Sequence, residues 1–434
     1  MNRRSFLIAT LPLAVSALCP AAEPAKSAPA PSPQKLVVHE WGTFLGVQGS
    51  DGTTLGGMVA SEEALPSFVE SRSYSTWDRV TMRSKMETPV TYFYTDRPMT
   101  VNVHVDMPKG VLTHWFPMVA NFGPPVERTS PGSPPVPQSP EQLKSFLSWE
   151  KVELIPHKPN LAIEAGKVIP TLWRVKATDP WRFARDTDAA FVKVRSRNML
   201  DWSEYDFEKF LFYRGLGTFD MPLQVQSSEV GNDVNLALLN RGPKPLTGMF
   251  AIWVNKDDVQ FGPLGALAGG GSRNVSLKSA LTTVLPINSG THPMMKQVAE
   301  ALMAAGLYEK EAWAMVNSWE KSYFRTPGLR ILFILPREAV DNYIPIQITP
   351  RPQEMVRVMV GRTEVLTPSQ ERQIERWITE LGAPDFKTRD AASAGLGRLG
   401  RLSEPALRRV MAITQSAEVR KSANNLIQAA IRAQ

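Results

Sequence analysis

The feature that most constrains the fold is a succession of short apolar segments between residues 35 and 288. The segments are rich in β-branched and aromatic residues and are bounded by Pro, Gly or Asp, as in KLVVHEWGTFLGV, TPVTYFYT and MTVNVHVDMP. Segments of this length and composition are typical of β-strands. We therefore predict a mainly β protein, α+β overall, whose first part is a β-rich domain over residues 35–222.

Two stretches modify this pattern. Residues 123–140 are rich in proline, which lacks the backbone N–H that a sheet or helix needs, so we predict a long surface loop there. Residues 223–288 continue the strand pattern, with Gly- and Asn-rich turns between the segments. Short strands at regular spacing predict a second part of the body that resembles a β-sandwich.

Residues 289–365 begin with a helical pattern and end with apolar, strand-like segments. The second of two predicted helices, over residues 308–324, has apolar side chains at helical spacing on one face, namely Ala312, Val316, Trp319 and Tyr323. We predict that this region supplies a helical pair, together with strands that complete the body.

Residues 366–434 have the pattern of a small all-α tail. Thr367 and Gln370 form a capping box, and Pro368 occupies the first helical position. The tail resembles a single HEAT-like helical repeat, on the strength of Asp385, Arg389, Ala391, Leu396, Gly400, Pro405, Leu407, Val419 and Arg420. Such repeats need several copies to bury their apolar faces. Because about one and a half copies are present, we expect the tail to dock on the body or to pair with another chain.

The N-terminus has the pattern of an export signal. Arg3 and Arg4 precede an uncharged apolar stretch over residues 6–19, which is shorter than the roughly 20 residues that a membrane-spanning helix needs. The paired arginines resemble the twin-arginine motif, and the alternative is a general secretory signal. We predict a signal peptide over residues 1–21, a disordered Pro/Ala tether over residues 22–34, and a periplasmic or secreted bacterial protein with no membrane span after signal removal.

Cys19 is the only cysteine, and it lies within or beside this signal. Leu18 before it is a poor match to a lipoprotein cleavage site, although lipidation is not settled by the sequence. Removal of the signal leaves no thiol, which excludes disulfides, a cysteine nucleophile and cysteine-bound metals. The formal net charge of +7 includes Arg3 and Arg4. The remaining mild excess does not indicate nucleic-acid binding.

Glu40 is the first candidate catalytic residue, because it lies on a strand among apolar neighbours. Such a carboxyl group has a raised pKa if it is unpaired, as general acid chemistry requires. Glu311 on the predicted helix and Asp341 before a strand are candidate second carboxylates. The alternative is that Glu40 is paired with an arginine, such as Arg357 or Arg362.

His104 and His114 are candidate metal ligands. They lie on the two arms of a predicted hairpin, VNVHVDMPKGVLTHWF, and with a carboxylate they could hold zinc. The alternative is that both are strand histidines bonded to neighbours. The adjacent His39 and Glu40 point to opposite faces of their strand and do not share a metal. No HExxH, GxSxG, SxxK or phosphate-loop motif is present, so the sequence leaves any cofactor unknown.

Tryptophan is the other residue type that suggests a ligand. Side chains of this kind could line a sugar-binding groove, or they could belong to the core, as aromatic residues at strand spacing usually do. The candidates are Trp41, Trp115, Trp173, Trp181, Trp202 and Trp253.

Four strings resemble recurring blocks of a group of uncharacterised exported bacterial proteins: VVHEWGTF, KMETPVTYFYTD, EKFLFYRGLG and GLYEKEAWAMVNSWEKSYFRTPGLRILFILPR. The resemblance covers most of residues 36–365 and implies one shared body fold around the HEWGTF strand, but no function. We favour a non-enzymatic envelope protein that binds a protein or glycan partner. The alternative is an exported hydrolase acting on carbohydrate or peptide through carboxylates or a histidine-bound metal. An exposed apolar face on the tail helices would favour the first hypothesis.

Overall fold

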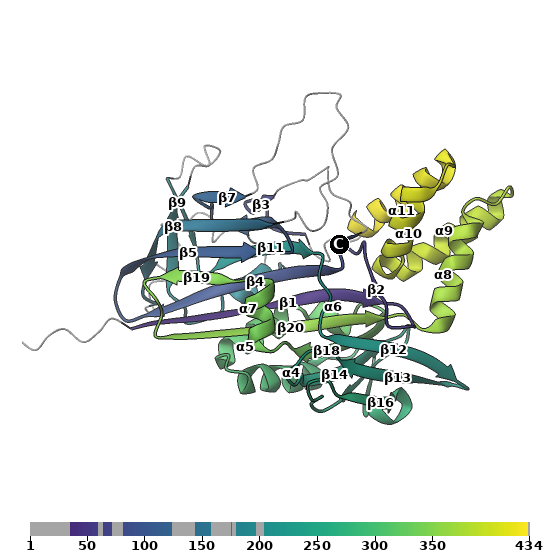
Figure 1. Ribbon diagram of the computed structural model, residues 1–434, viewed down its shortest axis with the longest axis horizontal. Helices are drawn as coiled ribbons and strands as arrows, with labels where there is room; N and C mark the ends of the chain where they lie inside the picture. The colour runs from purple at the N-terminus through teal and green to yellow at the C-terminus, as the bar shows by residue number, and fades with distance from the viewer. Residues whose placement is uncertain are drawn as a thin grey trace, which may run out of the picture. The chain divides into compact units, whose positions relative to one another are not determined.

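Strand β1 (Leu36–Gln48) lies at the centre of an 11-stranded sheet (Figure 1). The computed structural model describes residues 35–59, 64–71, 81–123, 144–157, 175, 179–196 and 204–432. The predicted signal and tether, and residues 124–140 of the Pro-rich loop, lie outside the described residues. All 13 residues of β1 are buried, because both faces of the sheet are covered there.

The large sheet has the order β17-β15-β14-β18-β20-β1-β4-β11-β6-β3, and β2 pairs with β1. Its centre brings distant parts of the chain together, since β1 pairs in parallel with β20 and antiparallel with β4. The other members are β2 (Thr54–Leu55), β3 (Glu70–Ser71), β4 (Ser84–Thr95), β6 (Gly110–Phe116), β11 (Leu211–Gly217), β14 (Thr247–Val254), β15 (Asp258–Pro263), β17 (Thr283–Pro286), β18 (Gly328–Ile334) and β20 (Glu354–Val365).

A second sheet has the order β10-β9-β8-β5-β19, and β7 pairs with β8. Its strands are β5 (Met99–Met107), β7 (Asn121–Gly123), β8 (Ser145–Ile155), β9 (Phe191–Arg195), β10 (Tyr205–Glu208) and β19 (Ile346–Thr349). A third sheet contains β12 (Leu223–Val230), β13 (Asp233–Asn240) and β16 (Ser272–Ser276). Residues 223–288 are therefore divided, because β14, β15 and β17 belong to the large sheet.

The predicted hairpin over residues 101–116 is wrong. Strand β5 pairs with β8 and β19, whereas β6 pairs with β11 and β3. The short turn between them carries the chain from one sheet to the other. The alternation of apolar residues correctly indicated strands, and Val101, Val103 and Val105 are buried. Alternation does not specify the partner of a strand, however, and that choice was the error.

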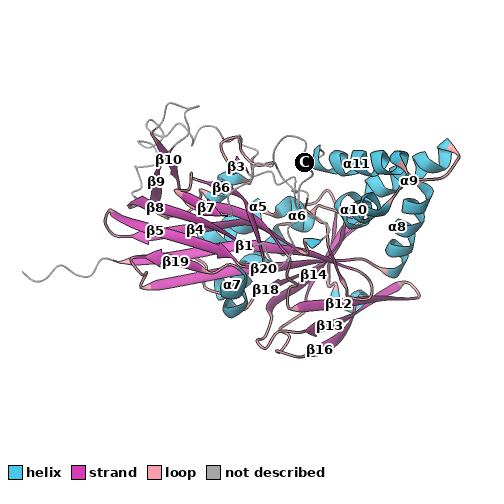
Figure 2. Cartoon of the chain, turned by 45° about the horizontal axis from the view of Figure 1, so that its top comes forward, coloured by secondary structure: helices cyan, strands magenta, loops and turns pink. Residues whose placement is uncertain are grey.

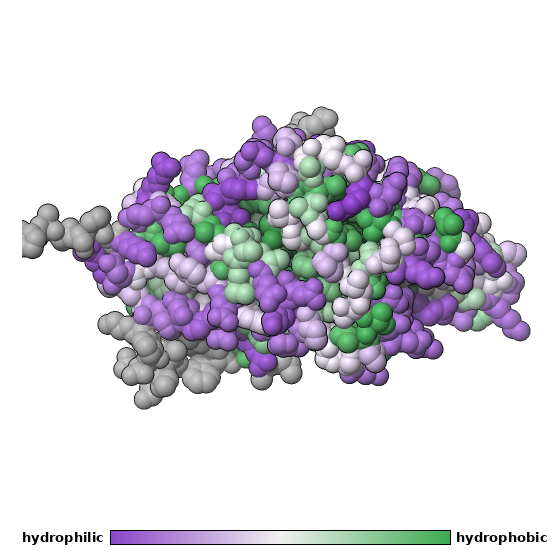
Figure 3. Space-filling view, turned by 90° about the horizontal axis from the view of Figure 1, so that it is seen from below, coloured by the Kyte–Doolittle hydropathy of each residue, from purple (hydrophilic) through white to green (hydrophobic). Residues whose placement is uncertain are grey.

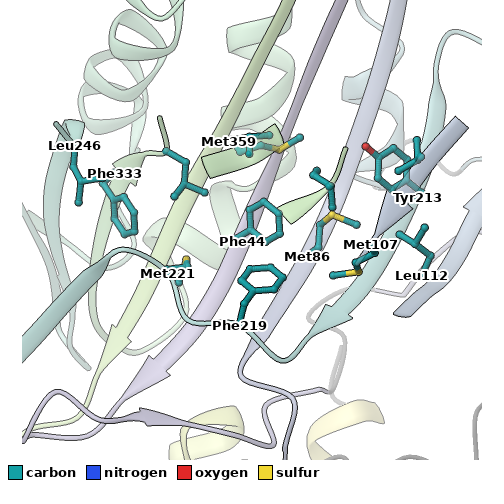
Figure 4. Packing of buried hydrophobic residues seen from close by; sticks show 14 of the residues in the cluster. Phe44, Met86, Met107, Leu112, Tyr213, Phe219, Met221, Leu246, Phe333 and Met359 are labelled. Carbon is teal, nitrogen blue, oxygen red and sulfur yellow. The ribbon is translucent and has the colours of Figure 1, made fainter. Parts of the chain in front are cut away.

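The sheets pack against each other around one large hydrophobic core (Figure 4). Phe44, Phe333 and Met359 of the large sheet contribute to it. The second and third sheets supply residues such as Trp149 and Leu236 to the same cluster. This layered arrangement confirms the mainly β, α+β prediction. Residues 223–288 do not form a separate sandwich, because their strands are shared between the large sheet and the third sheet.

Helices cover the opposite face of the large sheet (Figure 2). The helices on this face are α4 (His292–Ala304), α5 (Glu309–Ser318), α6 (Glu320–Phe324) and the short α2 (Trp181–Ala184). Two further helices, α3 (Leu277–Ala280) and α7 (Arg337–Tyr343), do not belong to this group. The predicted apolar face of residues 308–324 is buried. The single predicted helix is two helices, because α5 ends at Ser318 and α6 begins at Glu320, with Trp319 between them.

The tail consists of α8 (Pro368–Glu380), α9 (Phe386–Leu399), a 3-10 turn at Gly400–Ser403, α10 (Glu404–Ile413) and α11 (Ala417–Arg432) (Figure 1). The predicted capping box at Thr367 is present. The tail docks on the body, since Leu45 and Val47 of β1 share a core with Ile374 and Leu402. No helix in the described part of the chain is long and apolar enough to span a bilayer.

Candidate functional site

Glu40 is enclosed in the core between the sheets and is 0% exposed. Its Oε2 accepts a hydrogen bond from Nε of Arg357 at 2.5 Å, and its Oε1 accepts from the hydroxyl groups of Tyr213 and Thr91. Arg357 also donates to Asp341 at 2.6 Å, which ties β20 to α7. The arginine pairing that was the alternative for Glu40 is therefore confirmed, with Arg357 as the partner.

Glu311 lies on the other face of the sheet. It binds Nδ1 of His39 at 2.7 Å, and it accepts hydrogen bonds from the Tyr94 hydroxyl at 2.7 Å and the Tyr308 backbone N–H at 2.8 Å. His39 and Glu40 point to opposite faces of β1, as alternation requires. The structure consequently does not bring Glu40 and Glu311 together, and they form no pair of catalytic carboxylates.

His104 and His114 are also separated, because β5 and β6 belong to different sheets. His104 contacts Asp106 at 3.2 Å and stacks on Phe146. Burial and the charge of Arg214 lower the pKa of His114 to about 3. The register on which the zinc prediction depended is absent, and the described residues contain no group of three or more His, Cys, Asp or Glu placed to hold a metal.

A row of buried charges crosses the helix-covered face of the large sheet. Lys85 and Glu87 form an ion pair on β4. On β20, Glu364 binds Arg362 at 2.8 Å, and it also binds Arg330 of β18 at 3.1 Å. Arg401 of the tail reaches the same carboxylate at 2.8 Å. We refer to these residues and Arg214 of β11 as the charge row.

Sequence reasoning missed almost all of this row. Only Arg362 was named, and it was named as a partner for Glu40. The available signal was the presence of charged residues inside otherwise apolar strands, as in RILFI and VGRTEV. Charged side chains are almost never fully buried unless they are paired, so such positions predict ion pairs.

One end of the charge row forms part of a cavity, which we call the aromatic cavity. Its walls include Trp41, Trp181, Trp319, Phe210 and Phe212, and its polar lining includes Glu87, Arg214 and Asp179. Of the tryptophans considered from the sequence, Trp41 and Trp181 lie here. Trp115 and Trp253 pack elsewhere, and Trp173 and Trp202 lie outside the described residues.

A second hollow, the tail groove, lies between α8 and α10 and has a volume of about 210 Å³. Its apolar lining comes from α8, α10 and the adjoining body: Leu55, Leu366, Ile374, Ile378, Leu402, Pro405, Ala406, Val410 and Ile413. Ile413 is 76% exposed, which is unusual for a large aliphatic side chain. Glu371 and Glu375 on α8 and Arg409 on α10 add two acidic residues and one basic residue to the lining.

Hydrophobic side chains are also exposed elsewhere on the surface. On the face in Figure 3 they gather toward the middle, between hydrophilic regions. The large hydrophobic side chains most exposed in the described part of the chain include Ile413, Phe386 and Val230. Single exposed residues need no explanation, whereas an apolar hollow between two helices does.

No family model and no curated protein matches this chain. Among solved structures, the yeast delta-COP-I mu-homology domain complexed with Dsl1 WxWxV peptide is 8% identical, with a TM-score of 0.26 over 76% of this chain and 98% of that chain. The yeast delta-COP-I mu-homology domain alone is 8% identical, with a TM-score of 0.27 and the same coverage. Scores this low do not show a shared fold, so these likenesses carry no argument about function.

Proposed function

We propose that this is an exported bacterial envelope protein that binds a partner protein through the tail groove. The observation that carries the proposal is the apolar lining of the groove, to which both α8 and α10 contribute. An apolar hollow of about 210 Å³ left open on a docked helical tail is the feature that distinguishes partner binding from the hydrolase alternative. Of the carboxylates considered for the hydrolase alternative, Glu311 lies on the other face of the sheet from Glu40, while Glu40 and Asp341 are both bound to Arg357.

The occupant that fits best is an amphipathic helix of the partner. Helices dock in apolar grooves through residues at helical spacing. The groove is acidic on the α8 side, at Glu371 and Glu375, and basic on the α10 side, at Arg409. A complementary helix would therefore present a basic residue toward α8 and an acidic residue toward α10, and this pattern would fix its orientation.

Export is supported by the sequence of residues 1–21. Arg3, Arg4 and the apolar stretch that follows have the order expected of a signal, and small residues at Ala21 and Ala22 offer a cleavage site. Cell fractionation and the mass of the mature chain test this part. A mature chain that begins near Ala22 in the periplasm or medium supports it, and an uncleaved cytoplasmic chain contradicts it.

Photo-cross-linking in the native host tests the groove. A photoreactive residue at Ile413 should yield a discrete adduct with one partner. The same residue at Val284, which is 57% exposed on β17, is the matched control. Adducts at both positions alike, or none at Ile413, would contradict the proposal.

A further inference from the structure

The helices that form the tail groove, α8 and α10, lie side by side (Figure 2). Several of their charged side chains are paired within the chain, as Arg372–Glu229, Arg376–Glu380 and Arg408–Glu404. Glu371 also has a partner, because its carboxylate accepts a hydrogen bond from the Ser50 hydroxyl. Glu375 and Arg409 differ, since both are exposed and neither forms an ion pair with any residue that the structure describes. These two charges are therefore available to a partner.

Glu375 and Arg409 have opposite signs and lie on opposite sides of the tail groove. A surface that carries an acid on one helix and a base on the other is complementary to itself. A two-fold axis that runs along the groove, between α8 and α10, places Glu375 of each copy opposite Arg409 of the other. Two ion pairs then form. A second copy of the chain thus satisfies the charge pattern of the groove with two helices, its own α8 and α10.

The apolar part of the same surface is also self-complementary. Ile413 lies at the end of α10 and is 76% exposed, beside a hollow of about 210 Å³. The two-fold rotation brings Ile413 of one copy to the groove of the other, where Ile378 and Val410 offer apolar contacts. Removal of a large aliphatic side chain from water favours association. The exposed side chain and the hollow therefore suit each other across the axis.

The contact surface is small. Helix α8 has 13 residues and α10 has 10. At about 1.5 Å per residue and with axes about 10 Å apart, two such helices present a face of about 400 Å². Each partner in a stable complex buries roughly 800 Å², so association through this face alone is weak. We expect a dissociation constant on the order of 10–100 µM.

We propose that this protein forms a weak symmetric dimer in which the tail groove of each copy binds α8 and α10 of the other. The inference rests on the proposed function, because it names the partner that occupies the same groove. Since the association is weak, the groove is open when the chain is dilute and closed when the chain is concentrated.

Sedimentation velocity of the purified full chain, at concentrations from well below to well above this constant, tests the dimer. We expect a reversible shift from monomer to dimer and no larger species, because a two-fold contact is closed. Glu375→Arg and Arg409→Glu should each weaken the dimer about tenfold or more, because each variant replaces both ion pairs by contacts between like charges.

Mixing the two variants is the sharpest test. In a dimer of one Glu375→Arg chain and one Arg409→Glu chain, opposite charges again meet at both contacts, so the mixed dimer should form about as well as the unaltered one. Arg376→Glu is the matched control, because it reverses an exposed charge of α8 outside the groove lining, and it should leave the dissociation constant unchanged. Absence of the mixed dimer, or unchanged affinity in both single variants, overturns the proposal.

Photo-cross-linking at Ile413 separates this inference from the proposed function. A chain that stays monomeric at every concentration, while the photoreactive residue captures a different protein, overturns the dimer and leaves the groove as a binding site. A chain that stays monomeric and captures nothing overturns both. An adduct of twice the mass of the chain, lost in the Glu375→Arg variant and regained on mixing with the Arg409→Glu variant, supports both.

Discussion

At the scale of single residues, the polar side chains of the HEWGTF strand act as fixed internal contacts. Glu40 and His39 each bind a residue far along the chain, Arg357 and Glu311 respectively. Alternation predicted that the two neighbours face opposite ways. It did not predict their partners, because the partners are 317 and 272 residues away and are brought near only by the β1–β20 pairing and by the packing of α5.

Glu40→Gln should destabilise the protein by about 3–5 kcal/mol, because it leaves Arg357 buried without its principal counter-charge. Glu338→Gln is the control, since Glu338 forms an exposed pair with Lys244, and it should have no measurable effect. Urea unfolding followed by circular dichroism measures both. Equal unfolding midpoints for the two variants would show that the Glu40–Arg357 pair is not a structural contact.

Acid sensitivity should depend in part on His114. Its pKa is about 3 in the folded protein against an ordinary value of 6.5, chiefly because of burial and then because of Arg214 and Lys85. Between these values the unfolded chain binds the extra proton, so stability falls as pH falls from about 6.5 toward 3. His114→Asn should flatten that part of the stability profile, because it removes the group whose pKa is lowered by folding. A profile identical to that of the unaltered chain would contradict the assignment.

At the scale of elements, local signals gave the correct type of structure more often than the correct partner. The capping box at Thr367 located the start of α8, because that signal is complete within four residues. The strand at residues 99–107 was also recognised, but its pairing was not. Strand pairing depends on contacts such as β5 with β19, which are distant in sequence.

The start of α8 offers an element-scale prediction. The Thr367 hydroxyl accepts from the Gln370 N–H, and the Gln370 side chain accepts from the Thr367 N–H at 3.0 Å. Thr367→Ala should cost about 1 kcal/mol of stability. Thr379→Ala, near the exposed end of the same helix, should cost less. Hydrogen exchange of the α8 amides and urea unfolding measure the difference, and an equal cost at both positions would contradict the capping role.

At the scale of the whole molecule, residues Lys35–Gln434 form one compact unit. The pairing of β1 with β20 joins the first and last strands of the body. Arg401 of the tail binds Glu364 of the charge row and so connects the tail to the body. The sequence indicated a separate helical tail and left its docking open. The sequence did not predict its contacts with Leu45 and Val47, because apolar residues of a strand do not show which element covers them.

Truncation tests this integration. A chain that ends at Leu366 exposes Leu45 and Val47 and removes Arg401 from Glu364, so it should unfold at a lower temperature and aggregate. Removal of residues 1–34 is the control and should leave the unfolding temperature unchanged, as expected for a signal and tether. A tail-less chain as stable as the full chain would show that the docking contacts contribute little.

The most direct test of the central claim, partner binding at the tail groove, is the dissociation constant of the partner captured at Ile413. Calorimetry with the purified full chain should show that Ile413→Asp weakens binding about tenfold or more, as loss of an apolar anchor does. Val284→Asp, at another exposed aliphatic residue, should leave the constant unchanged. Equal affinities for both variants and the unaltered chain would contradict the claim.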